Sequence, residues 1–77
     1  MEIRVLFFGV LAEVSQTRFR HYRDIISFSD LVHRIADEYP EMNQYYYRIA
    51  VNGEIVNEDP VLKNMDEVAF MPPFAGG

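Results

Sequence analysis

The chain has 77 residues, of which 49% are hydrophobic, and it contains five tyrosines and six phenylalanines. This length and composition fit one compact domain with a single core, and they exclude a disordered chain as well as a deep, self-contained active site. The net charge of −5 argues against nucleic acid as a partner, and the absence of cysteine excludes disulfides and thiolate zinc sites.

The start of the chain bears on its location. Residues 1–4 have neither the basic start nor the apolar run of a signal peptide, and no apolar stretch approaches the length that spans a membrane. Small secreted domains also usually need disulfides. We therefore expect a cytoplasmic protein with no membrane partner.

The first third of the chain predicts two strands that flank a short helical segment. Residues 2–8 alternate in character, and Leu6 and Phe8 make the second face apolar too, which predicts a largely buried strand. Residues 10–15 favour one or two helical turns. Residues 17–25 predict an exposed second strand that pairs with the first.

One amphipathic helix follows. Ser27 and Asp30 have the spacing of a capping box, in which each side chain accepts a free backbone N–H. Ile26 is expected to pack on Leu31 as a hydrophobic staple. Apolar residues then recur at helical spacing until Pro40, which predicts about three turns of helix with an apolar stripe that needs a sheet to cover it.

The second half of the chain predicts a hairpin and a final strand. Residues 45–51 are aromatic and β-branched, an Asn-Gly turn stands at 52–53, and residues 54–56 form the returning arm. Residues 67–71 predict the last strand, and the prolines at 72–73 stop any further ladder. The element order predicts an α+β, ubiquitin-like β-grasp fold: a mixed sheet of four or five strands with one main helix packed on one face. The first and last strands, being the most apolar, are expected to form the central pair.

The side chains of this domain offer few catalytic parts. We interpret His21 and His33 as isolated surface histidines, and Asp37, Glu38 and Glu41 as a solvated charged face. No nucleophile–base grouping, metal-ligand spacing or phosphate-binding glycine loop is present.

The run of three tyrosines at residues 45–47 has two interpretations. It could form an exposed binding patch. Alternation along a strand instead places at least one of the three side chains in the core.

The remaining candidate is the tail, residues 72–77, which we separate from a domain at residues 1–71. Its two prolines favour an extended path, and the tail could reach roughly 20 Å at about 3.3 Å per residue. Gly76 and Gly77 have no Cβ, so they could enter a slot only one backbone wide. Such an end suits chemical activation inside another protein, whereas a frayed terminus, the alternative, has no need of the prolines or of Phe74.

The sequence resembles the small, sulfur-carrying subunits of molybdopterin synthase. The resemblance rests on residues 3–13, the capped helix from Ser27, residues 50–54 and above all residues 66–77, which end in Pro-Pro-Phe-Ala-Gly-Gly. The double proline separates this family from the related sulfur carriers of the thiamine pathway and from ubiquitin-like modifiers. One departure is Asn-Met-Asp at residues 64–66, where the family usually has Asp-Gly-Asp. We expect Asn64 to take the left-handed backbone there.

The resemblance implies a reaction cycle carried out on Gly77 by partner proteins. An E1-like adenylyltransferase uses ATP to adenylate the Gly77 carboxylate, and a sulfur donor converts it to a thiocarboxylate. The thiocarboxylate then passes sulfur to cyclic pyranopterin monophosphate in the large subunit of molybdopterin synthase. Two small and two large subunits form a heterotetramer, and the carrier itself holds no catalytic side chains, bound cofactor or metal.

The implied site is therefore the end of the chain. Gly77, with Gly76, is the reacting end. The implied partner-binding residues are Met71, Pro72, Pro73, Phe74, Ala75 and the sheet face near Phe7. The alternatives are a sulfur carrier of the thiamine pathway and a non-enzymatic β-grasp interaction module.

Overall fold

The computed structural model describes residues 1–73 and contains five strands and three helices. The strands are β1 (Ile3–Phe7), β2 (Phe19–Tyr22), β3 (Arg48–Val51), β4 (Glu54–Val56) and β5 (Glu67–Met71). The helices are α1 (Val10–Ser15), α2 (Phe28–Glu38) and the 3₁₀ helix η1 (Pro40–Gln44). All the predicted elements are present, and only η1 was not expected.

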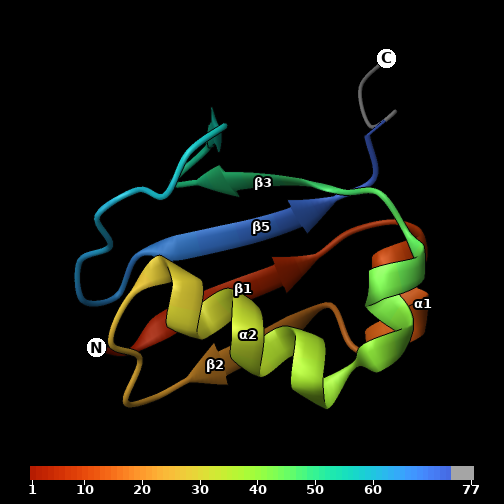
Figure 1. The fold of residues 1–77 in the computed structure, drawn as a ribbon, viewed down its shortest axis with the longest axis horizontal. Helices are drawn as coiled ribbons and strands as arrows, with labels where there is room; N and C mark the ends of the chain where they lie inside the picture. Colours follow the sequence, from red (N-terminus) through yellow and green to blue (C-terminus); the bar gives the residue numbers. More distant parts are fainter. Residues whose placement is uncertain (74–77) are drawn as a thin grey trace.

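The strands form one mixed sheet in the order β2-β1-β5-β3-β4 (Figure 1). The central strands β1 and β5 are parallel, and every other neighbouring pair is antiparallel. A strand with a neighbour on each side has little access to water, which explains why the most apolar strands take the centre. The predicted central pair and the predicted β-grasp arrangement are both confirmed.

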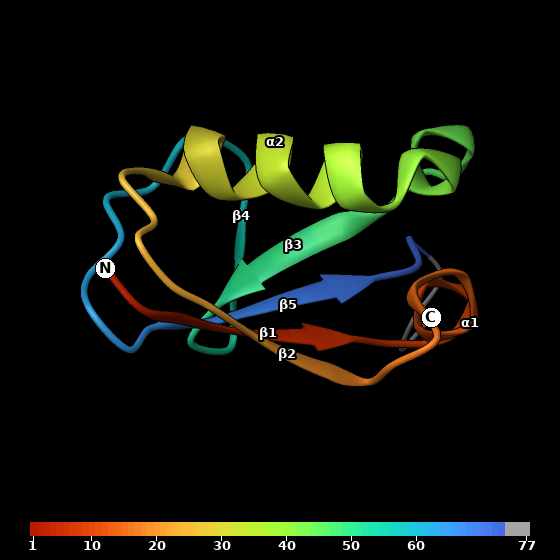
Figure 2. The ribbon, with the colours of Figure 1, turned by 90° about the horizontal axis from the view of Figure 1, so that it is seen from below.

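The core lies between the sheet and α2, which covers one face (Figure 2). Phe7 and Phe70 meet there with ring centroids 5.8 Å apart, and Leu31 and Ile35 of α2 pack onto them within the same cluster. These side chains are between 0% and 2% exposed. The opposite face of the sheet has no helix over it in the described part of the chain, and some of its side chains, among them Phe19 and Ile55, are exposed.

The N-terminus of α2 is capped as predicted, but the staple is wrong. Ser27 Oγ accepts the Asp30 N–H at 3.1 Å, and Asp30 Oδ2 accepts the Ile26 N–H at 2.9 Å. The Ile26 side chain is 84% exposed, whereas the neighbouring Ile25 is buried. The chain therefore enters the helix one residue out of phase with the staple pattern.

The turn before β5 places its left-handed residue at Met65 (φ 69°), so the expectation for Asn64 is wrong. The physical reason is a double contact with Glu2. Asn64 Oδ1 accepts the Glu2 N–H at 2.8 Å, and the Met65 N–H donates to the Glu2 carbonyl at 2.6 Å. These bonds fix the turn against β1 and leave the strained backbone to a residue with a Cβ.

We expect Met65→Gly to stabilise the fold by about 0.5–1 kcal/mol. Removing the Cβ relieves left-handed strain of roughly 1–2 kcal/mol, and the greater entropy of glycine in the unfolded chain offsets part of that gain. Urea denaturation measures the change. The matched control, Asn64→Gly, loses the acceptor for the Glu2 N–H and should destabilise the protein. A lower stability for Met65→Gly would contradict the assignment of strain to residue 65.

The predicted boundary between a domain at 1–71 and a tail at 72–77 is only partly within view. Pro72 and Pro73 are described, whereas residues 74–77 lie outside the described residues and that part of the prediction stays open. None of the helices at positions 1–73 has the length and apolar character needed to cross a bilayer.

Candidate functional site

The site begins where the central strand β5 leaves the sheet (Figure 1). Its last residue, Met71, is paired with Arg48 of β3. On the other side, the Phe8 N–H donates to the Phe70 carbonyl at 3.0 Å. Pro72 and Pro73 follow directly, beside the point where β1 turns into α1. The fold thus delivers the chain to this end of the sheet through a strand that is paired on both sides.

Gly9 gives Pro72 a defined place. Gly9 has a φ of 56°, and a Cβ built on it would lie 2.7 Å from Cγ of Pro72. The proline ring therefore occupies space that only glycine leaves free, and the close approach fixes the direction in which the chain passes α1.

The uncovered face of the sheet carries an apolar row that crosses all its strands. The strand registers align Phe19, Leu6, Ala69, Ala50 and Ile55. Phe19 and Ile55, at the two ends of the row, are 49% and 48% exposed. A continuous apolar surface of this kind on a small domain is typical of a protein-binding face.

The apolar row continues toward the exit of β5. Phe8, which follows β1, is 46% exposed, and together with Leu6 it lines an open groove of about 860 Å³ that runs toward α1. Met71 is half-buried on the same face by register. We define Leu6, Phe8, Phe19 and Met71 as the exit surface.

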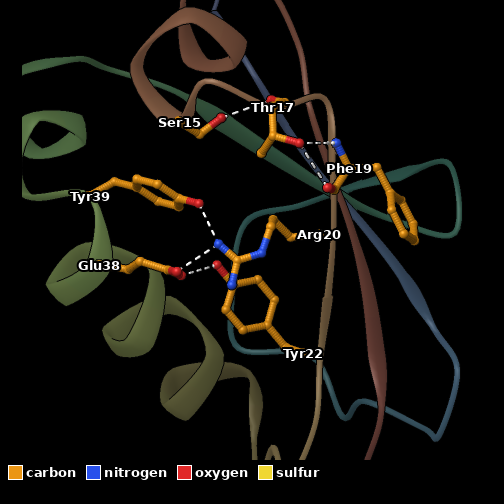
Figure 3. Close-up of polar contacts among 7 residues, drawn as sticks. All are labelled: Ser15, Thr17, Phe19, Arg20, Tyr22, Glu38 and Tyr39. Atoms are coloured by element: carbon orange, nitrogen blue, oxygen red, sulfur yellow. Dashed lines mark hydrogen bonds and ion pairs between the residues drawn. The ribbon is translucent and has the colours of Figure 1, made fainter.

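Short polar bonds fix the turn that presents Phe19 (Figure 3). Ser15 Oγ donates to the Thr17 carbonyl at 2.8 Å. Thr17 Oγ1 donates to the Phe19 carbonyl at 3.0 Å and accepts the Phe19 N–H at 3.3 Å. The aromatic ring is thus held at the edge of the exit surface rather than left on a free loop.

Phe7 was predicted to lie near the docking face, and this residue assignment needs correction. Phe7 is 2% exposed and packs edge-on against Tyr39, with ring centroids 5.8 Å apart. A partner cannot reach it without unfolding the core. The neighbouring Phe8 faces outward instead. The alternation of β1 carried the signal, because a sheet with one helix over it buries every second residue only.

The other predicted partner-binding residues divide into two groups. Met71, Pro72 and Pro73 lie together at the exit of β5, where Pro73 is exposed. Phe74, Ala75, Gly76 and Gly77 lie outside the described residues, and their roles stay predictions.

The tyrosine run resolves into one core residue and two surface residues. The Tyr47 ring lies 5.3 Å from that of Phe70, and burial raises the pKa of its hydroxyl. Tyr45 is 38% and Tyr46 is 89% exposed. Both earlier interpretations therefore hold for part of the run, and Tyr46 stands next to the end of the sheet.

A polar cluster joins β2 to the end of α2 (Figure 3). Glu38 accepts from the Tyr22 hydroxyl at 2.5 Å and from Arg20 Nη1 at 2.6 Å. Arg20 Nη1 also donates to the Tyr39 hydroxyl at 2.5 Å, and the guanidinium lies 5.0 Å from the centre of the Tyr22 ring. Glu38 is exposed, as expected for a solvated face, but it is also bonded to Arg20 and Tyr22, and the sequence separation hides these contacts.

The charges of this cluster indicate a structural contact between β2 and the end of α2 rather than a reaction centre. Burial alone raises the pKa of the Glu38 carboxyl, but the bonds from Tyr22 and Arg20 outweigh it, so that the pKa lies below its ordinary value. Burial, then the bond to Glu38, raises the pKa of Tyr22. Glu38 is therefore held ionised and Tyr22 protonated, which removes both from proton transfer near neutral pH.

No other grouping suggests chemistry on the domain itself. His21 and His33 are both exposed, as expected. Across residues 1–73, no three His, Asp or Glu side chains are gathered in a way that could hold a metal ion. What the described residues offer is an exposed apolar surface at the exit of β5.

Three comparisons with known proteins agree with this geometry. A family model described as the ThiS family matches residues 5–77. The chain is 33% identical to the molybdopterin synthase sulfur carrier subunit of Mycobacterium tuberculosis, over all of this chain and 99% of that protein. The solved structure of a putative molybdopterin converting factor, subunit 1, from Pyrococcus furiosus superposes with a TM-score of 0.84 at 21% identity, covering 95% of this chain and 98% of that one.

A further solved structure contains a partner. In the complex of subunits 1 and 2 of the molybdopterin-converting factor from Helicobacter pylori 26695, the matching chain has a TM-score of 0.75 at 22% identity, with both chains covered in full. At this identity the likeness shows the shared β-grasp fold.

Proposed function

The chain belongs to the ThiS family, and we propose that it is the sulfur carrier subunit of a molybdopterin synthase. In this proposal its partner is the large subunit of that enzyme, and its own domain supplies docking and delivery rather than catalysis. The related protein from Mycobacterium tuberculosis, which matches end to end at 33% identity, supports the choice of pathway.

One observation carries the proposal. The central strand ends at Met71 and is followed by two prolines beside an exposed apolar surface, while the described residues offer no reaction centre elsewhere. This arrangement supports the proposal that the residues after Pro73 are presented to a partner. A domain organised in this way presents its end to another protein.

The proposed chemistry takes place on the carboxyl group of Gly77. An E1-like adenylyltransferase transfers AMP from ATP to the carboxylate and releases pyrophosphate. A sulfur donor then displaces AMP and leaves a thiocarboxylate. In the large subunit, the sulfur forms a bond to a side-chain carbon of cyclic pyranopterin monophosphate as a carbon–oxygen bond there breaks. Water then cleaves the acyl–sulfur bond, which leaves the sulfur on the pterin and returns Gly77 to the carboxylate. AMP is needed because a carboxylate oxygen is otherwise a poor leaving group.

The exit surface has a distinct role in this cycle. Phe8 and Phe19 bury apolar area against the large subunit, and that contact holds the chain end near the pterin. Tethering raises the effective concentration of the reacting group and removes the need for a free sulfur species in solution. The complex named for the Helicobacter pylori proteins supports a small-subunit to large-subunit contact of this kind.

Partner choice tests the proposal against its nearest alternative. We expect the purified chain to bind the large subunit of molybdopterin synthase from the same organism and not its thiazole synthase, as measured by isothermal titration calorimetry. Intact mass first establishes that Gly77 is the last residue of the protein used. Preference for the thiazole synthase would assign the chain to the thiamine pathway, and binding to neither would overturn the carrier assignment.

A further inference from the structure

Pro72 and Pro73 follow β5, a strand that has a neighbour on each side. The N–H that each proline lacks would therefore face a different neighbouring strand. In β5, even-numbered residues bond to β1: the Phe8 N–H donates to the Phe70 carbonyl at 3.0 Å. Odd-numbered residues bond to the β3 side: the Asn52 N–H donates to the Glu67 carbonyl at 2.8 Å. Successive backbone N–H groups of a strand point in opposite directions, so in a β5 continued past Met71 position 72 would face β1 and position 73 would face β3.

On the β1 side, the backbone acceptor that would extend the ladder is already in use. An N–H at position 72 would point at the Phe8 carbonyl, which already accepts the Leu11 N–H at 3.1 Å. Beyond Phe8 the chain turns at Gly9 into α1. The ring of Pro72 instead packs over Gly9, so Pro72 acts there through steric packing and not through its missing N–H.

On the β3 side, an acceptor is open. The antiparallel register pairs Arg48 with Met71, and the next hydrogen-bonded pair in that register is Tyr46 with residue 73. The backbone leading into it is extended, with φ −117° and ψ 146° at Tyr45. Counting only partners at positions 1–73, neither backbone group of Tyr46 makes a backbone hydrogen bond, and its side chain is 89% exposed. An ordinary residue at position 73 could therefore lengthen β5 along this segment.

We propose that Pro73 is a positioning residue that keeps β5 from zipping onto Tyr45–Tyr47, because it lacks the N–H that the Tyr46 carbonyl would accept. The inference rests on the proposed carrier function, since a longer β5 matters only if the chain end has to reach a partner. Each residue drawn into the strand would be lost from the reach of the tail, at about 3.3 Å per residue.

Three variants distinguish the effect of the missing N–H of Pro73 from the effect of its ring. Pro73→Ala restores the donor toward Tyr46, and Pro72→Ala restores a donor toward an acceptor already in use. Pro73→N-methylalanine removes the ring but keeps the N–H absent. The last variant is made by ligating a recombinant 1–68 segment to a synthetic 69–77 peptide through a temporary cysteine at position 69, which desulfurisation converts back to the native alanine.

Amide hydrogen exchange measures directly whether position 73 pairs with Tyr46. In Pro73→Ala, we expect the new amide at position 73 to exchange about 2- to 10-fold more slowly than in an unstructured peptide, the range set by one net backbone hydrogen bond, and the Tyr46 amide to slow with it. The new amide of Pro72→Ala should exchange without protection. No protection at position 73, or equal protection in both alanine variants, would overturn the inference.

Activation kinetics read the consequence. If part of the population has its end paired to the sheet, the KM of the adenylyltransferase for Pro73→Ala should rise about 2- to 10-fold with kcat unchanged, because only the competent fraction binds. The N-methylalanine variant should regain the wild-type KM. An N-methylalanine variant as impaired as Pro73→Ala would place the effect in the ring and overturn the inference. A wild-type chain that is not adenylated at all would instead overturn the carrier function. The exchange measurements would still test the pairing at position 73, because they do not depend on adenylation.

Discussion

Removal of Gly77 is expected to abolish sulfur transfer while leaving the folded domain intact. The deletion moves the terminal carboxylate back by one residue, or about 3.3 Å. A misplacement of about 1 Å can already cost roughly 100-fold in rate, so we expect the loss to exceed that. The measurement is molybdopterin formation in a mixture of the carrier, the adenylyltransferase, ATP, a sulfur source and the large subunit.

The control for this deletion lies at a distance from the exit surface. Val61→Ala changes a side chain that is 89% exposed in the loop before β5 and should leave both sulfur transfer and thermal stability unchanged. The thermal midpoint of the chain lacking Gly77 should equal that of the wild type, since no core residue is touched. Wild-type rates of molybdopterin formation from the shortened chain would rule out Gly77 as the reacting end.

Two neighbouring phenylalanines are expected to have opposite roles when each is changed to alanine. Phe7→Ala leaves a cavity against Phe70 and Tyr39 and should cost about 3–5 kcal/mol of stability, a large part of the total for a small domain. Phe8→Ala removes an exposed ring and should change the stability by less than about 0.5 kcal/mol. At the proposed interface, however, Phe8→Ala should weaken binding to the large subunit by at least about 10-fold.

Denaturation by urea and titration calorimetry together give the two results. Ile55→Ala is the matched control for Phe8→Ala, because the two side chains are exposed to similar extents and Ile55 lies at the far edge of the sheet. Equal affinities for the wild type and Phe8→Ala would remove Phe8 from the interface. A large loss of stability in Phe8→Ala would instead show that its ring belongs to the core.

The sequence patterns that predicted the fold are short-range and periodic. The capping box at Ser27, the apolar stripe of α2 and the Asn-Gly turn at 52–53 each act within a few residues, and the structure confirms all three. The central place of β1 and β5 was predicted from composition, because the first and last strands are the most apolar of the chain.

The features that sequence reasoning missed depend on contacts between distant segments. The left-handed backbone of Met65 is imposed by Glu2, and the ionised state of Glu38 by Arg20 and Tyr22, and no local pattern encodes either pairing. Ile26 was misplaced because the helix entry follows the buried Ile25 instead.

The candidate site was half predictable. The two prolines were read from the sequence and lie at the exit of β5, whereas the role of the Gly-Gly end stays a prediction. The outward-facing residue among residues 6–8 was mispredicted because all three are apolar, although the alternation along β1 carries the signal. The open acceptor at Tyr46 depends on the β3–β5 register, which composition does not reveal.

The mass of the intact protein from its native host tests the central claim most directly. If the terminal carboxyl group of this chain carries sulfur, a fraction of the molecules from sulfur-replete cells should be heavier by one sulfur-for-oxygen exchange, with fragmentation placing that exchange on Gly77. Cells that lack the adenylyltransferase should yield only the lighter form. A single unmodified mass in sulfur-replete wild-type cells would contradict the account.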